Sequence, residues 1–261
     1  MHGAIIAGLL AALAFFSTAP ARAGEELIRL PARPGVTQPF WLLTPPAQPV
    51  ASVILFTGGN GILGSAHRPV LRGQNFLIRS RDKFAAAGFL VASVDTPSDH
   101  LEGLDGFRSS AEEAQDIAAV IAYLRQKAPV PVWLIGTSMG TISAANVTAR
   151  LQSGGADGLV LTSSIVGQSR RAAPIGASVD VAAITVPTLF VHNKEDACFI
   201  CPFSLVPSLM ERFTHARKRE LIAVSGGEPP QSGPCQALSR HGYFGIEDEV
   251  VNDIVRWIKG T

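Results

Sequence analysis

Val132-Trp133-Leu134-Ile135-Gly136-Thr137-Ser138-Met139-Gly140 runs from four apolar, β-favouring residues straight into the pattern Gly-x-Ser-x-Gly. A helix-forming run, residues 141–147, follows it. The order strand, sharp turn, helix lifts the hydroxyl of Ser138 above the end of a sheet, where a base can reach it. Glycine is needed two residues either side of the serine, because a side chain there would collide with the neighbouring strand or the helix start. The pattern alone is weak, and its strand-before, helix-after context is what predicts a nucleophilic serine.

The same alternation of strand and helix extends over the rest of the chain. Apolar runs typical of buried strands alternate with helical segments from residue 51 onward, and two shorter β-like pieces before it predict an edge hairpin. We expect strands at 27–30, 40–43, 52–56, 89–94, 132–135, 158–162, 187–192 and 220–224, and helices at 76–87, 110–127, 141–147 and 246–258. This predicts an α/β fold, a mostly parallel central sheet flanked by helices, with ligands at the carboxyl ends of its strands.

The first 23 residues are typical of a secretory signal. Residues 3–16 are apolar, and Ala21-Arg22-Ala23 forms a small-x-small cleavage site before Gly24. The apolar run is too short for an ordinary membrane-spanning helix, although an uncleaved anchor is the alternative. We therefore expect a signal peptide at 1–23, one domain at 24–261, and a secreted or periplasmic protein with no membrane segment after cleavage.

The charge balance bears on possible partners. Removing residues 1–23 removes Arg22 and no acidic residue, so the mature chain has 21 basic and 21 acidic side chains. A neutral chain argues against a nucleic-acid partner, whose binding needs a basic face. We expect a small-molecule substrate, no cofactor and no metal, and the sequence leaves the oligomeric state open.

A serine hydroxyl needs a hydrogen-bonded base, and the base needs a third group that fixes its tautomer. Asp196 follows the strand at 187–192 directly and is the candidate acid, with Glu195 as the alternative. His241 lies between the last strand and the final helix and is the candidate base. Other histidines are expected on a helix, inside a strand and in an early loop, at His215, His192 and His67.

A glycine-rich loop, Thr57-Gly58-Gly59-Asn60-Gly61, follows the strand at 52–56. Missing β-carbons let backbone N–H groups approach a ligand oxygen, so the N–H of Gly59 or Asn60, paired with that of Met139, predicts an oxyanion hole. The alternative is a turn that needs glycine only for its geometry. A phosphate-binding loop is excluded because no Lys-Ser/Thr follows the last glycine.

The chain order Ser138, Asp196, His241, together with Thr57-Gly58-Gly59, resembles the α/β-hydrolase superfamily over about residues 51–261. It looks nearest to small secreted bacterial hydrolases of the dienelactone-hydrolase or serine-aminopeptidase-like branches. The resemblance implies a serine hydrolase that cleaves an ester or small amide through an acyl-enzyme, with at most a small lid at 163–183. Thr57, where many members have His, and Thr141, where Gly or Ala is common, depart from the pattern without removing a catalytic atom.

Two other functions stay open at this point. One is acyl transfer, in which an alcohol replaces water as acceptor on the same triad. The other is a non-catalytic binding protein on a hydrolase scaffold, against which the intact Ser, Asp, His order counts. The sequence does not choose among ester, lactone, thioester and short peptide substrates.

Three cysteines, Cys198, Cys201 and Cys235, remain in the mature chain. Export permits a disulfide, and a Cys198–Cys235 bond would tie the loop of the acid to the loop of the base. A Cys201–Cys235 bond and no bond at all are the alternatives. The same cysteines with His241 could also form a zinc site, but it would consume the base, and the exported context argues against it.

Overall fold

The computed structural model describes residues 24–261 except 66–70, 72, 153 and 171–172. The predicted signal peptide and His67 lie outside the described residues. Within the part that is described, no helix is long and apolar enough to cross a bilayer.

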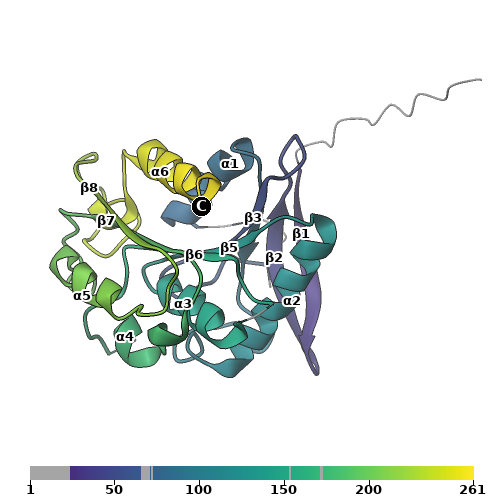
Figure 1. Ribbon diagram of the computed structural model, residues 1–261. Helices are drawn as coiled ribbons and strands as arrows, with labels where there is room; N and C mark the ends of the chain where they lie inside the picture. The colour runs from purple at the N-terminus through teal and green to yellow at the C-terminus, as the bar shows by residue number, and fades with distance from the viewer. Residues whose placement is uncertain (1–23, 66–70, 72, 153, 171–172) are drawn as a thin grey trace, which may run out of the picture.

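One eight-stranded sheet forms the centre of the molecule, in the order β1-β2-β4-β3-β5-β6-β7-β8 (Figure 1). β2 pairs antiparallel with β1 and β4, and every other neighbouring pair is parallel. The strands are β1 (Glu25–Arg33), β2 (Val36–Leu43), β3 (Ala51–Phe56), β4 (Phe89–Val94), β5 (Val132–Thr137), β6 (Gly158–Thr162), β7 (Thr188–Asn193) and β8 (Arg219–Val224). The parallel strands place their carboxyl ends at one edge, where the loops after β3, β5, β6 and β7 meet.

Helices cover both faces of this sheet. Figure 1 shows α1 and α6 on one face and α2 and α3 on the other. The helices are α1 (Phe76–Ala86), α2 (Ala111–Lys127), α3 (Gly140–Leu151), α4 (Ile175–Ser178), α5 (Val206–Glu211) and α6 (Glu247–Lys259). α2 begins where the sequence predicts, because the hydroxyl of Ser110 accepts a hydrogen bond from the N–H of Glu113 at 3.0 Å.

Two hydrophobic cores lie on opposite faces of the sheet. Side chains alternate along a strand, so β5 packs Leu134 into the core beneath α2 and α3 and Ile135 into the core beneath α1 and α6. Burial on both faces is why the inner strands are continuous apolar runs rather than alternating ones. The predicted α/β fold with a mostly parallel sheet is confirmed.

Two loop segments, the one that contains His215 and the one at 163–183, bear on expectations drawn from the sequence. His215 was expected on a helix, and this prediction was wrong: α5 ends at Glu211, and His215 lies in the turn after it. The chain turns there because Phe213 is buried edge-on against Phe190, with ring centres 5.0 Å apart. The segment 163–183 is short and, in its described part, contains only α4 and a 3-10 turn, Val181–Ala183.

Candidate active site

Ser138 lies at the sharp turn between β5 and α3. It is a non-glycine residue with positive φ, +52°, a conformation that side chains rarely adopt. A β-carbon at Gly136 would collide with the backbone of Gly140, and one at Gly140 with the carbonyl of Phe56. Thr141 helps to close the turn, because its hydroxyl donates to the carbonyl of Ser138 at 2.5 Å. The turn therefore has the strained geometry that exposes a nucleophile.

Asp196 and His241 meet although 45 residues separate them. His241 Nδ1 lies 2.8 Å from Asp196 Oδ2, and the backbone N–H of Cys198 donates to Asp196 Oδ1 at 2.8 Å. Burial by itself would raise the pKa of Asp196, but hydrogen bonds from His192, His241 and the Cys198 N–H lower that pKa below its ordinary value. Asp196 is therefore an ionised acceptor that orients the His241 ring.

Glu195, the alternative acid, faces elsewhere. Its carboxylate accepts from the N–H of Gly226 at 2.8 Å and lies 3.4 Å from Arg240. Its side chain is half exposed, whereas that of Asp196 is fully buried. The arrangement favours Asp196 as the partner of His241.

Ser163 and Tyr243 support His241 from behind. The Ser163 hydroxyl donates to the carbonyl of His241 at 2.8 Å, and the buried Tyr243 hydroxyl donates to the carbonyl of Val191 at 2.8 Å. Tyr243 also accepts from the Ser163 N–H at 3.0 Å. Both residues have positive φ, so the chain adopts strained backbone on either side of this contact. Sequence reasoning missed the pair.

A pocket of about 290 Å³ opens beside Ser138 and His241, and both residues line it. His241 Nε2 is buried and has no hydrogen-bond partner among the described residues. In this structure no hydrogen bond joins Ser138 to that nitrogen, as is common before substrate binds. The Ser138 side chain instead takes part in a hydrogen bond with the Cys201 thiol.

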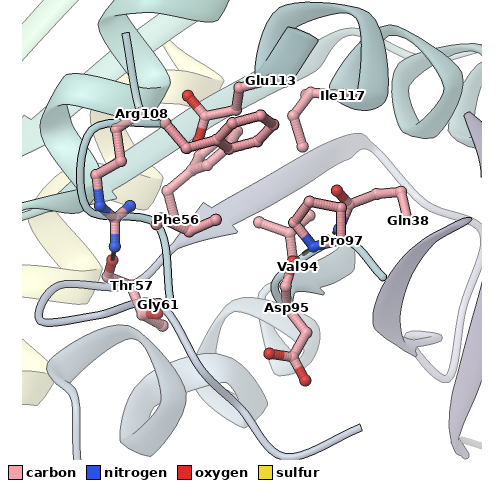
Figure 2. Close-up of a pocket in the computed structure, with 12 residues that line it drawn as sticks. Gln38, Phe56, Thr57, Gly61, Val94, Asp95, Pro97, Arg108, Glu113 and Ile117 are labelled. Carbon is pink, nitrogen blue, oxygen red and sulfur yellow. Dashed lines mark hydrogen bonds between the residues drawn. The ribbon is translucent and has the colours of Figure 1, made fainter. Parts of the chain in front are cut away.

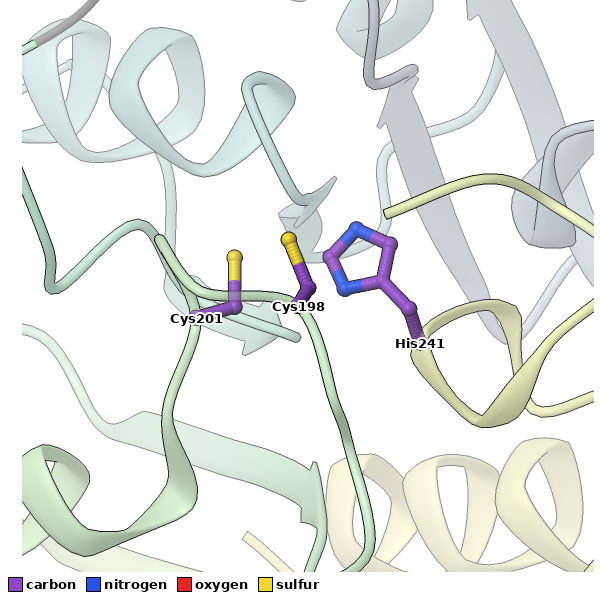
Figure 3. A group of neighbouring side chains, drawn as sticks. All are labelled: Cys198, Cys201 and His241. Carbon is purple, nitrogen blue, oxygen red and sulfur yellow. The ribbon is translucent and has the colours of Figure 1, made fainter. Parts of the chain in front are cut away.

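Cys198 and Cys235, 37 residues apart, form a disulfide with a Cα–Cα distance of 4.6 Å. Cys201 is free and buried. Burial raises the pKa of the Cys201 thiol, as does the charge of Asp196, while a hydrogen bond with Ser138 acts in the opposite direction. Figure 3 shows Cys198, Cys201 and His241 side by side, with possible ligand atoms within 4.8 Å of one another. The Cys198 sulfur is bonded to Cys235, however, so with the disulfide formed these residues do not offer a zinc site its thiolates.

The glycine loop after β3 lies directly against the nucleophile. A β-carbon on Gly58 would come within 2.9 Å of Ser138 Cβ, and Gly59, with φ of +62°, lines the pocket. Asn60 does not line it, and its side chain accepts from the N–H of Ile62 at 3.3 Å. The N–H groups of Gly59, Asn60 and Met139 all donate to no acceptor among the described residues. Pocket lining therefore favours Gly59 over Asn60 as a candidate oxyanion donor, whereas Met139 is not itself among the residues that line the pocket.

A buried arginine, Arg108, holds this loop in place through hydrogen bonds to its carbonyl groups. Arg108 donates to the carbonyls of Thr57 and Gly59 at 3.1 and 3.3 Å, and to the hydroxyl of Ser143 on α3 at 2.8 Å. Figure 2 shows its guanidinium directed at Thr57, with Glu113 nearby. Arg108 thus fixes the glycine loop to the helix that follows Ser138. No local pattern marks this residue in the sequence.

Asn75 lines the same pocket as His241, and sequence reasoning also missed it. Its side-chain oxygen caps α1 by accepting from the N–H of Leu77 at 3.0 Å. Because that bond fixes which end of the amide is the oxygen, Nδ2 is left on the side of Gly58 and Ser138. An asparagine directly before the helix expected at 76–87 is typical of a helix N-cap, and this was the sequence signal that could have identified Asn75.

Comparison with solved structures shows the fold. An esterase from Pyrococcus furiosus superposes with a TM-score of 0.66 at 12% identity, covering 91% of each chain. A lidless α/β serine hydrolase from Xanthomonas campestris gives 0.57 at 16% identity, over 92% of this chain and 96% of that one. A dienelactone hydrolase from Anabaena variabilis gives 0.61 at 12% identity, over 92% and 99%. The chain therefore has the α/β-hydrolase fold, and the resemblance drawn from the sequence is confirmed at that level.

No family model matches the chain, and a search of the curated proteins finds no match. The assignment of an activity consequently depends on the geometry of the site.

Proposed function

We propose that this protein is a serine hydrolase that cleaves an ester-type or small amide bond through an acyl-enzyme on Ser138. The observation that supports this most is the pocket itself. It brings together a serine on a strained turn, a histidine whose Nε2 is unpartnered, and a glycine loop with free N–H groups. The esterases and serine hydrolases of the same fold support the same reading.

In the proposed reaction, His241 Nε2 takes the proton of Ser138 as the serine oxygen attacks the substrate carbonyl carbon. The N–H groups of Gly59 and Met139 stabilise the oxyanion that develops. The tetrahedral intermediate collapses, the bond to the alcohol or amine breaks, and His241 gives its proton to that leaving group. Water then attacks the acyl-enzyme with His241 again as base, which releases the acid and restores Ser138.

Asp196 acts only through the histidine in this scheme. It holds the Nδ1–H tautomer, so that Nε2 is free to accept the proton, and it stabilises the imidazolium that forms. Its lowered pKa keeps it ionised for that purpose.

The test is labelling of the mature protein with a fluorophosphonate probe, followed by peptide mass spectrometry. We expect one adduct, on Ser138, and none in Ser138→Ala. The same substitution should lower kcat on p-nitrophenyl esters by roughly four to six orders of magnitude with folding intact. An unlabelled but folded wild-type protein would show that the fold serves as a binding scaffold.

A further inference from the structure

Two histidines approach the same oxygen of Asp196. His241 Nδ1 lies 2.8 Å from Oδ2, and His192 Nε2 lies 3.5 Å from it. His192 is on β7, and its side chain is fully buried, as is that of Asp196. The usual triad needs only one histidine on its acid, so the second requires an explanation.

The tautomer of His192 follows from its shorter contact. His192 Nε2 lies 2.8 Å from the carbonyl oxygen of Cys201, which can only accept. Nε2 therefore carries the hydrogen and donates it to that carbonyl, while Asp196 Oδ2 lies 3.5 Å from the same nitrogen. His192 Nδ1 is buried without a partner among the described residues, so a second proton there would be left unsatisfied. The geometry is that of a neutral ring that donates from Nε2.

This single N–H donates to one end of the turn that carries the acid and lies close to the other end. Asp196 is near its start and Cys201 at its end, and the Cys198 N–H holds the other carboxylate oxygen from the middle. The ionisable groups facing the His192 ring are Asp196 and, through the shared oxygen, His241. The ring of Phe203 lies against that of His192, with ring centres 6.0 Å apart. Without His192, Oδ2 would keep only His241, and the buried Cys201 carbonyl would lose its donor.

We propose that His192 is a positioning residue for the triad acid: its Nε2–H fixes the Asp196 carboxylate and the 196–201 turn, so that Oδ2 faces His241. The proposal rests on the proposed hydrolase function, because it assigns His192 to the same reaction. His192 touches no substrate and acts only through Asp196.

The first experiment uses two amides of different reach. In His192→Gln the side-chain nitrogen is as many bonds from the backbone as Nε2, whereas in His192→Asn it is one bond shorter. Both bury an amide, so the cost of burial is matched. We expect His192→Asn to lower kcat on p-nitrophenyl acetate about 10- to 100-fold, the range for a hydrogen bond to a charged group, with KM changed less than about twofold. His192→Gln should recover most of that loss. Equal losses in the two variants would overturn the proposal.

The second experiment separates positioning through Asp196 from a general structural role. In the Asp196→Asn background, His192→Asn should add little further loss, because the group it orients is already impaired. The same fold-loss in both backgrounds would show that His192 acts independently of the acid, and the proposal would fail. Thermal unfolding of all four proteins checks that each one folds.

A failure of the proposed function is distinguishable from a failure of this inference. Wild-type protein that does not react with the fluorophosphonate refutes the function. The histidine ¹⁵N NMR spectrum then still decides the contact, without any activity. We expect His192 as the Nε2–H tautomer, with a proton resonance that moves in Asp196→Asn. An Nδ1–H tautomer, or a resonance unaffected by that substitution, refutes the inference.

Discussion

The two halves of the candidate active site are held in different ways. The nucleophile half is one continuous segment, β5, Ser138 and α3, in which two glycines permit a turn that other residues would block. The acid–base half comes from two loops, after β7 and after β8, joined by the His241–Asp196 hydrogen bond and a disulfide, and Ser163 in the loop after β6 contacts Tyr243 beside them. The first half is determined by local sterics, and the second by contacts between distant segments, so the two should fail in different ways.

The largest expected effect comes from the acid–base half. His241→Ala should lower kcat about as much as loss of Ser138, and Asp196→Asn by about 10⁴, the size known for a triad whose histidine takes the wrong tautomer. Steady-state kinetics on p-nitrophenyl esters measures both. Glu195→Gln is the matched control, because that neighbouring carboxylate faces Gly226 and Arg240. Its kcat should stay within a few-fold of wild type, and a loss as large as that of Asp196→Asn would reassign the acid.

The glycines that shape the turn in the nucleophile half should affect folding rather than chemistry. The methyl group of Gly140→Ala would collide with backbone atoms of Phe56 and Thr57, which no rotamer can relieve. We expect the free energy of unfolding to fall by about 3 kcal/mol or more, measured by urea denaturation. Gly233→Ala is the control, because its β-carbon would meet only Gln236 at an ordinary 3.5 Å, and it should be near neutral. Gly140→Ala with wild-type stability would contradict the steric account of the turn.

This difference also explains which parts of the fold and of the candidate site can be predicted from the sequence. Strand runs, helix periodicity and the Gly-x-Ser-x-Gly turn are local, so the fold class and the position of Ser138 follow from residues close together in the chain. Asp196 and His241 could be predicted once the sheet topology was assumed, because in this topology their loops must lie at the carboxyl edge of the sheet.

The residues that sequence reasoning missed share one property. Except for Asn75, whose cap contact is local, each makes its decisive contact with a segment far away: Arg108 with Thr57, 51 residues before it, and Tyr243 with Ser163, 80 residues before it. A side chain that meets its partner only after the sheet has formed leaves no spacing or periodicity to detect. His192 was recognised as a strand residue, but its approach to Asp196 depends on how the following turn folds back over β7.

The disulfide tests how much of the acid–base half is held covalently. Its 37-residue separation suggests, by chain entropy alone, that replacing both cysteines in Cys198→Ala/Cys235→Ala lowers the free energy of unfolding by about 3–4 kcal/mol. Replacing both avoids a new bond between Cys201 and the remaining partner. The melting temperature of the wild type should fall on reduction, and that of the double variant should not respond. In mild reductant we expect the wild type to lose activity before it unfolds, because the bond lies beside Asp196 and His241. A wild type whose stability ignores reductant would show that the loops hold without the bond.

Glu113 on α2 lies near Arg108, which is hydrogen-bonded to α3. The titration of Glu113 therefore tests the packing next to the nucleophile half. Burial raises the pKa of this carboxyl from 4.5 to about 8, although the charge of Arg108 opposes the rise. Between these two values the folded protein holds a proton that the unfolded chain releases, so the free energy of unfolding should fall as pH rises from about 4.5 to about 8.

The size of this effect is on the order of 5 kcal/mol across the window. Chemical denaturation at pH 5, 7 and 9 measures it, with Glu113→Gln as the matched variant, since glutamine keeps the shape and does not titrate. The difference in stability between variant and wild type should move in favour of the variant as pH rises. A difference independent of pH would mean that Glu113 is ionised in the folded protein.

The smallest expected effect concerns Asn75, which belongs to neither half of the site but lines the same pocket. Its oxygen caps α1 and its Nδ2 is left toward Gly58 and Ser138, so we expect one side chain to combine a structural role with a contact to substrate. Asn75→Ser keeps a good cap and removes only the donor, so stability should hold while kcat/KM falls about tenfold, the value of one hydrogen bond. Asn75→Asp also keeps the cap but sets a negative charge beside the developing oxyanion, and it should lose more. If serine and aspartate instead lower kcat/KM equally, or neither does, then the Asn75 amide does not face the reacting group, and its only role is to begin the helix.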